Sequence, residues 1–147
     1  MFQLTKEPID IQPLIDEVSH RNAGAVLTFL GTVRELTNGK RTVKLEYHAY
    51  ESMAQKMLQR IGDEVKGKWP DVNIAITHRL GVLHISEVAV AIAVSSPHRK
   101  DAYDANAFAM ERIKEMVPIW KKEHWDDGTS WIGDQQEENG REETAHG

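Results

Sequence analysis

The sequence predicts an α+β fold in which helices pack on a mixed or antiparallel sheet. Two stretches, 51–66 and 96–117, carry apolar residues every three or four positions, which is typical of amphipathic helices. Other stretches, such as 42–50 and 87–95, alternate side chains with the period of a strand. Strands and helices do not alternate regularly along the chain, so an α+β arrangement is favoured over a doubly wound sheet.

The N-terminal part of the chain is predicted to form one short helix and one strand. After a lead-in over residues 1–9, residues 10–20 place their apolar side chains on one helical face, with Asp10 as a candidate N-cap. Residues 25–33 are apolar nearly throughout. This composition predicts a strand that is buried on both faces.

A second strand is predicted at 42–50, after a polar segment that contains the turn signal Asn38-Gly39. Its alternation predicts one apolar and one polar face. The apolar set is Val43, Leu45, Tyr47 and Ala49, and the polar set is Lys44, Glu46 and His48. After the helix at 51–66 come a further strand at 72–78 and a bend at Gly81.

The last predicted helix follows directly from the strand at 87–95. Ser96 is a good N-cap, Pro97 suits the first helical position, and Pro118 ends the helix. One stripe of this helix is predicted to face the core. Its members are Ala102, Ala105, Ala109, Ile113 and Met116.

Length and composition fit one globular domain. We expect a single domain over residues 1–133 and a polar, disordered tail over 134–147. The formal net charge of −5 argues against nucleic-acid binding. Without a run of about eighteen apolar residues or a signal peptide, we expect no membrane association and a cytoplasmic location. The chain has no cysteine, which excludes a thiolate nucleophile or a persulfide on this chain.

Cationic side chains gather at both ends of the last helix. His98 and Arg99 lie in its first turn, where the backbone N–H groups and the helix dipole attract anions. Lys114 lies in its last turn, and Lys121 and Lys122 follow the break. Along a continuous helix the two groups are about 22 Å apart. Either they serve separate sites or two chains pack so that the helix start of one meets the helix end of the other; we favour the second arrangement.

Each of these features also has a structural explanation. The seven histidines form no HxxxH or HExxH motif, so we expect no metal site, and no phosphate-binding GxxxxGK[ST] loop is present. Lys121-Lys122 fits a solvated face, Lys114 complements the helix dipole, and Arg34 fits a solvated strand end. The residues alone therefore predict an α+β domain with an anion-binding pocket.

Five segments together resemble the MoaE family, the catalytic large subunit of molybdopterin synthase. They are GAVLTFLGTVR (24–34), LEYHAYESMA (45–54), HRLGVL (78–83), IAVSSPHRKDAYDA (92–105) and VPIWKKEHWDDGTSW (117–131). The match spans roughly residues 5–133, in the order and at spacings compatible with that family. One departure is Ser86-Glu87, where family members often have Gly-Glu. Another concerns the C-terminal part, which in this family can contribute a basic residue to the neighbouring pocket. Here only Arg141 is available, far into the polar tail, and we assign it no role.

The resemblance implies a sulfurtransferase that converts cyclic pyranopterin monophosphate to molybdopterin, without a cofactor of its own. Sulfur arrives as a thiocarboxylate on the C-terminal Gly-Gly of a small ubiquitin-like subunit. Large subunits form a homodimer at the centre of a heterotetramer, and the fold contains a hammerhead-like β motif. The implied catalytic residues are Lys114 and Lys121, and the implied substrate-binding residues are Phe29, Arg34, His98, Arg99, Met110, Lys122 and Glu123.

The chemistry of these residues fits the implied roles. Arg99 with His98 at a helix start is suited to a phosphate. We expect Lys121 to meet the thiocarboxylate, Lys114 to assist proton transfer at the pterin carbons, and Glu123 to orient Lys121. Two alternatives stay open: a non-catalytic docking module for a ubiquitin-like tail, and an unrelated phosphate-ester enzyme that needs no protein partner.

Overall fold

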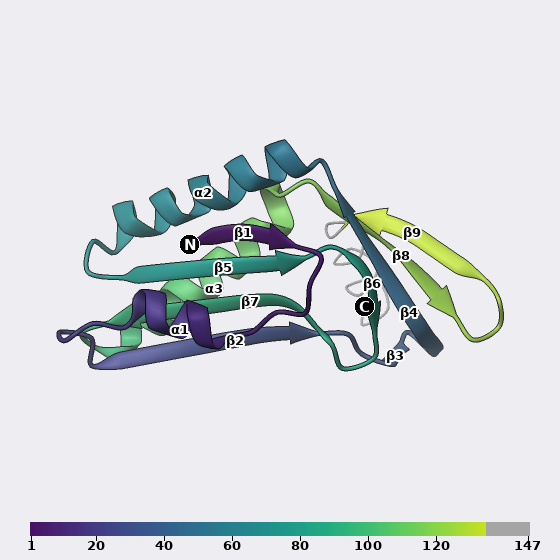
Figure 1. Ribbon diagram of the computed structural model, residues 1–147, viewed down its shortest axis with the longest axis horizontal. Helices are drawn as coiled ribbons and strands as arrows, with labels where there is room; N and C mark the ends of the chain where they lie inside the picture. Colours follow the sequence, from purple (N-terminus) through teal and green to yellow (C-terminus); the bar gives the residue numbers. More distant parts are fainter. Residues whose placement is uncertain (135–147) are drawn as a thin grey trace.

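The computed structural model describes residues 1–134, which form two sheets and three helices (Figure 1). The first sheet has four strands in the order β1-β5-β7-β2. Its strands are β1 (Phe2–Thr5), β5 (Asn73–Arg79), β7 (Val88–Ser96) and β2 (Ala25–Thr32). β7 pairs antiparallel with both β5 and β2, whereas β1 pairs parallel with β5. β2 is therefore an edge strand of this sheet.

The second sheet is antiparallel and lies across one end of the first (Figure 1). Its strands are β3 (Leu36–Thr37), β4 (Lys40–Ala49), β8 (Ile119–Trp125), β9 (Ser130–Asp134) and β6 (Gly81–His84). β4 pairs with β3, β6 and β8, and β8 pairs with β9. The prediction of an α+β fold is confirmed.

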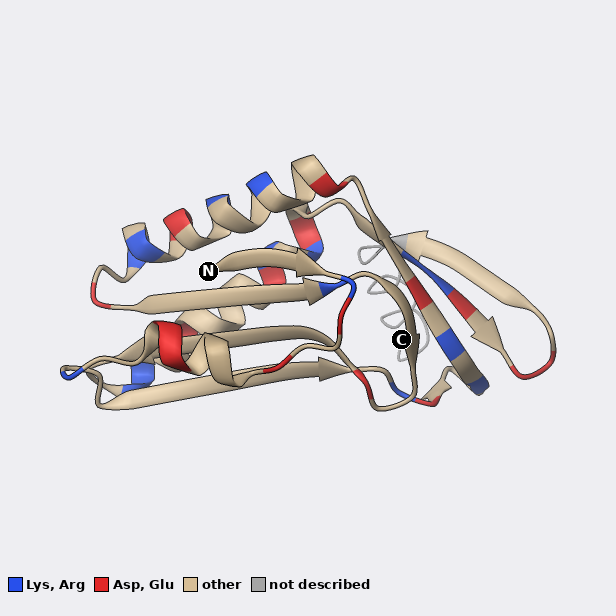
Figure 2. Cartoon of the chain, in the orientation of Figure 1, with Lys and Arg blue, Asp and Glu red and all other residues tan. Residues whose placement is uncertain are grey.

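Helices cover both faces of the first sheet. α2 (Glu51–Lys68) and α3 (Arg99–Met116) pack side by side on one face, and α1 (Gln12–Val18) packs on the other. The larger core lies under α2 and α3, and its fully buried residues include Leu58, Ile61, Ile76, Ile92 and Ile113. Charged side chains are sparse on this sheet and gather on the helices and the second sheet (Figure 2). No helix within residues 1–134 combines the length and apolar character needed to cross a bilayer.

Most element boundaries differ from those predicted by one to three residues, and the N-cap of α1 is Ile11 rather than Asp10. Two differences have a clear physical reason. The expected lead-in contains β1, which forms because it pairs with β5, a partner more than 70 residues away in the chain. α3 begins at Arg99 with His98 as N-cap, because Ser96 still pairs with Ala25 in the first sheet. The Ser96 hydroxyl donates instead to the His98 carbonyl. The expected tail lies outside the described residues, apart from Asp134 in β9.

The strand over residues 25–33 is not buried on both faces, as its composition predicted. β2 is at the edge of the sheet, and its burial alternates strictly along the strand. Leu27 and Phe29 pack against the larger core, whereas Val26 and Leu30 are 45% and 44% exposed. Apolar side chains on the outer positions of an edge strand indicate a surface that another element can cover.

The predicted alternation of β4 is wrong at Val43. The register with β8 shifts between Thr42 and Lys44, which makes Val43 a bulge that is 51% exposed. Thr42 is consequently turned inward and is only 2% exposed. Sequence periodicity does not reveal such a bulge, because the extra residue has no signature of its own.

Candidate active site

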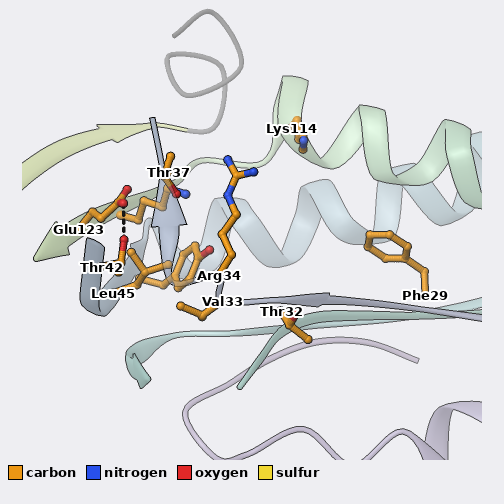
Figure 3. Close-up of a pocket in the computed structure, with 11 residues that line it drawn as sticks. Phe29, Thr32, Val33, Arg34, Thr37, Thr42, Leu45, Lys114 and Glu123 are labelled. Atoms are coloured by element: carbon orange, nitrogen blue, oxygen red, sulfur yellow. Dashed lines mark hydrogen bonds between the residues drawn. The ribbon is translucent and has the colours of Figure 1, made fainter. Parts of the chain in front are cut away.

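A cavity of about 380 Å³ lies where the end of β2 meets the second sheet and the last turn of α3. It collects cationic, carboxylate and hydroxyl side chains from segments far apart in sequence (Figure 3). The lining residues are Phe29, Thr32, Val33, Arg34, Thr37, Thr42, Leu45, Tyr47, Lys114, Lys121 and Glu123. In Figure 3 the Arg34 side chain extends from the end of β2 toward α3.

Lys121 and Glu123 reach the cavity from the same face of β8, because side chains two residues apart on a strand point the same way. They are 6% and 2% exposed, respectively. Lys121 lies opposite Tyr47 in the pairing of β8 with β4. Lys114 comes from the last turn of α3, which ends at Val117. Buried charges of opposite sign are thus held in one compact site.

Hydrogen bonds from two neighbours fix the Glu123 carboxylate. The Thr42 hydroxyl donates to its Oε1 at 2.6 Å, and the Trp125 indole donates to the same oxygen at 2.9 Å. A buried carboxylate without such donors would be strongly unfavourable. The sequence analysis missed both residues: Thr42 reaches the site only through the bulge at Val43, and no local pattern marks it.

A second cavity of about 200 Å³ adjoins the first and shares Phe29, Thr32, Tyr47 and Lys114 with it. It is more apolar, and its other lining residues are Gly31, His78, Ala89, Val90 and Met110. His78 donates from Nδ1 to the Arg79 carbonyl at 2.9 Å and meets the Tyr47 ring edge-on at 5.3 Å. Burial lowers the pKa of His78 to about 4, so its ring is neutral at pH 7.

A third cavity, of about 450 Å³, lies at the opposite end of α3 and is lined by Gly24, Ala25, Pro97, His98, Arg99, Lys100 and Tyr103. A Cβ at Gly24 would lie 2.4 Å from the Pro97 carbonyl oxygen, so only glycine lets the start of β2 approach this closely. Among the described residues, no side chain caps the first turn of α3. Its N–H groups, with Arg99 and Lys100, make this cavity suitable for an anion.

The structure brings five of the predicted residues together in the first cavity and places Met110 in the adjoining one. These five are Phe29, Arg34, Lys114, Lys121 and Glu123. It does not bring His98 and Arg99 there, since they lie at the other end of the 18-residue α3. Lys122 points to the opposite face of β8 from Lys121 and lies between Glu46 and Ile132 in the strand register. Within residues 1–134, no group of three potential metal ligands comes together.

Comparison with known proteins identifies the family. The model of the MoaE protein family matches residues 4–116. The chain belongs to the MoaE family. A relative from Bacillus subtilis, named molybdopterin synthase catalytic subunit, is 59% identical over 150 residues, covering 99% of this chain and 96% of the relative. One of the same name from Halalkalibacterium halodurans is 60% identical over 136 residues, covering 92% and 87% of the two chains.

The fold agrees with a solved MoaE-type structure. The crystal structure of molybdopterin synthase from Staphylococcus aureus superposes with a TM-score of 0.86 at 53% identity, covering 90% of this chain and 96% of the other. The predictions of a MoaE-type fold and of an enzyme related to molybdopterin synthase are therefore confirmed. The roles of individual residues stay predictions, which the geometry above now constrains.

Proposed function

We propose that this chain is the catalytic subunit of a cytoplasmic molybdopterin synthase. It transfers sulfur from the C-terminal thiocarboxylate of a small ubiquitin-like partner to cyclic pyranopterin monophosphate. The observation that carries the proposal is the buried Lys121–Glu123 pair, which shares one cavity with Lys114 and Arg34. In a chain whose relatives are named molybdopterin synthase catalytic subunit, that arrangement suits an anionic peptide end and a proton transfer beside it.

The first cavity receives the donor. A thiocarboxylate is an anion, and Arg34 and Lys121 provide two cations from different elements for it. Glu123, held by Thr42 and Trp125, orients the Lys121 ammonium group. The absence of cysteine is consistent with this role, because the sulfur arrives on the partner and needs no persulfide on this chain.

The adjoining cavity receives the ring of the acceptor. Phe29, Met110 and Val90 provide apolar contacts for a flat heterocycle, and Lys114 lies at the junction of the two cavities. The donor sulfur forms a bond to a pterin carbon while a carbon–oxygen bond at that carbon breaks, and Lys114 supplies the proton that the departing oxygen takes up. Water then cleaves the resulting thioester, so that sulfur stays on the pterin and the spent tail leaves as a carboxylate. A second round adds the second sulfur.

The phosphate of the acceptor is bound by a second copy of the chain. Within one copy, Arg99 is about 22 Å along α3 from Lys114, too far for both to hold one small substrate. In a homodimer the third cavity of one copy meets the first two of the other, so that His98 and Arg99 complete the site. Lys122 lines none of the three cavities, and we give it no role in catalysis.

Reconstitution tests this function against the docking alternative. The chain is mixed with a thiocarboxylated small subunit and cyclic pyranopterin monophosphate, and dithiolene product is measured. We expect Lys121→Ala to abolish turnover while it still co-elutes with the small subunit. Full activity of Lys121→Ala would instead support a docking module. Turnover of a phosphate ester without the small subunit would support the third hypothesis.

A further inference from the structure

An excursion of the chain between β5 and β7 connects the two sheets that build the first cavity. β5 and β7 belong to the first sheet, and between them the chain runs through β6, which pairs with β4 of the second sheet (Figure 1). In that pairing Gly81 lies opposite Tyr47, and Leu83 lies opposite Leu45. Both Tyr47 and Leu45 line the cavity. The position of β6 therefore sets where one wall of the site lies relative to the first sheet.

An ion pair closes this excursion at its base. Arg79 is the last residue of β5, and Glu87 directly precedes β7. Nη1 of Arg79 donates to Oε2 of Glu87 at 2.8 Å. The other oxygen of the same carboxylate accepts a hydrogen bond from the His84 backbone N–H at 2.7 Å. Glu87 thus ties the end of β5 to the end of β6.

Arg79 depends on Glu87 for compensation of its charge. Its side chain is only 11% exposed, and within residues 1–134 Glu87 is the carboxylate that contacts its guanidinium group. The buried Nε of Arg79 has no hydrogen-bond partner among these residues. A nearly buried cation that loses its counter-ion is strongly unfavourable. The loop over residues 84–87 is therefore expected to shift when the Glu87 charge is removed.

The same loop holds the residue that precedes Arg34. The Ser86 N–H donates to the Val33 carbonyl at 2.8 Å, and the Val33 N–H donates to the Glu87 carbonyl at 3.0 Å. The Val33 side chain is buried in a small apolar cluster with Leu83. Since both backbone groups and the side chain of Val33 are fixed, the Cα of Arg34 is fixed as well.

A bulge in β7 aims this segment at the cavity. The register of β2 with β7 shifts between Gly31 and Thr32, so that β7 carries one extra residue, Ala89. Such a bulge bends the strand and re-aims the side chains beyond it. Beyond this bulge the Arg34 side chain leaves the first sheet and extends toward α3 (Figure 3).

We infer that Arg79 and Glu87 are positioning residues for sulfur transfer. Their ion pair holds the loop over residues 84–87 against Val33 and thereby aims Arg34 at the C-terminal end of the donor. Neither Arg79 nor Glu87 lines any of the three cavities, so both act through Arg34. This inference rests on the proposed function, in which Arg34 binds the thiocarboxylate.

A double-mutant cycle on binding tests this role. The probe is the small subunit with an ordinary C-terminal carboxylate, and its dissociation constant is measured by calorimetry. Glu87→Gln misplaces Arg34 and should raise this constant about tenfold. In an Arg34→Ala background the same substitution should change it less than about twofold, because its effect passes through Arg34. A small subunit that lacks its last two residues should bind wild type and Glu87→Gln equally.

Two further variants separate positioning from stability. Glu64→Gln is the matched control, because Glu64 accepts two hydrogen bonds from Arg112, at 2.9 and 3.2 Å, and lines none of the cavities. It should lower the melting temperature but leave the dissociation constant unchanged. Arg79→Met combined with Glu87→Gln leaves neither charge unpaired, so the fold is kept. This double variant should show the same loss of binding as Glu87→Gln.

An unchanged dissociation constant in both Glu87 variants would overturn the inference, and so would an equal loss with and without Arg34. Binding is measured without sulfur transfer, so the two proposals can fail separately. A wild-type chain that gives the expected cycle but forms no dithiolene product would refute the proposed function and support the positioning role. A wild-type chain that does not bind the small subunit would overturn both.

Discussion

Thr42→Val removes the hydroxyl that donates to Glu123 while keeping nearly the same side-chain volume. The hydrogen bond is 2.6 Å long and both residues are 2% exposed, so the substitution leaves a nearly buried carboxylate with one protein donor fewer. A hydrogen bond to a charged group contributes roughly 1.5–3 kcal/mol. For a domain of this size each kcal/mol shifts the melting temperature by about 2–4 °C, so we expect a loss of about 3–12 °C. Sulfur transfer should also slow, because the proposed orientation of Lys121 by Glu123 would be lost.

The assay is thermal and urea unfolding, followed by the fluorescence of the four tryptophans. Thr37→Val is the matched control: Thr37 lines the same cavity and is similarly buried, but the structure records no bond from it to Glu123. Equal melting temperatures for the two variants would refute the argument that the Thr42 bond holds the carboxylate. A double-mutant cycle with Glu123→Gln measures the coupling directly.

Three further predictions concern the loop before β7 and the surface of β8. Ser86 has a φ of +72°, which glycine adopts without strain, so Ser86→Gly should stabilise the fold by about 0.5–1 kcal/mol in urea unfolding. The hydrogen bond from Arg79 lowers the pKa of Glu87. The ionised Glu87 carboxylate therefore stabilises the fold above about pH 4.3, the pKa of an unfolded glutamate, and this stabilisation is lost as pH falls through the folded-state pKa. Glu87→Gln should therefore make the free energy of unfolding depend less on pH in the acid range. Lys122→Ala should keep turnover near the wild-type rate and Lys121→Ala should lose it, and equal losses would contradict the strand geometry.

The local parts of the fold were predictable from sequence. Helices α2 and α3 and the alternating core strands follow from apolar spacing alone, because each forms a face that must be buried. The positions of the cations at the two ends of α3 also followed from this helix prediction. So did the distance of about 22 Å between the two groups along the helix. Resemblance to the family then added Phe29 and Met110, which have no chemical signature of their own.

The remaining features depend on distant partners. β1 forms a strand because it pairs with the edge of β5. β2 is half-exposed because, among the described residues, no strand pairs with its outer edge. Thr42 enters the site through a bulge in β4. None of these contacts leaves a periodic trace in the sequence, since each is set by packing between segments far apart in the chain or by an irregularity in one strand.

Mixed-copy complementation tests the composite site most directly. Arg99→Ala and Lys121→Ala should each inactivate the enzyme alone, and equal amounts are combined under conditions in which copies exchange. Half of the dimers are then mixed, and each has one site with both residues intact, so activity should return to about a quarter of the wild-type value. No recovery, although native mass spectrometry shows mixed dimers, would mean that Arg99 and Lys121 act within one chain and would contradict the account.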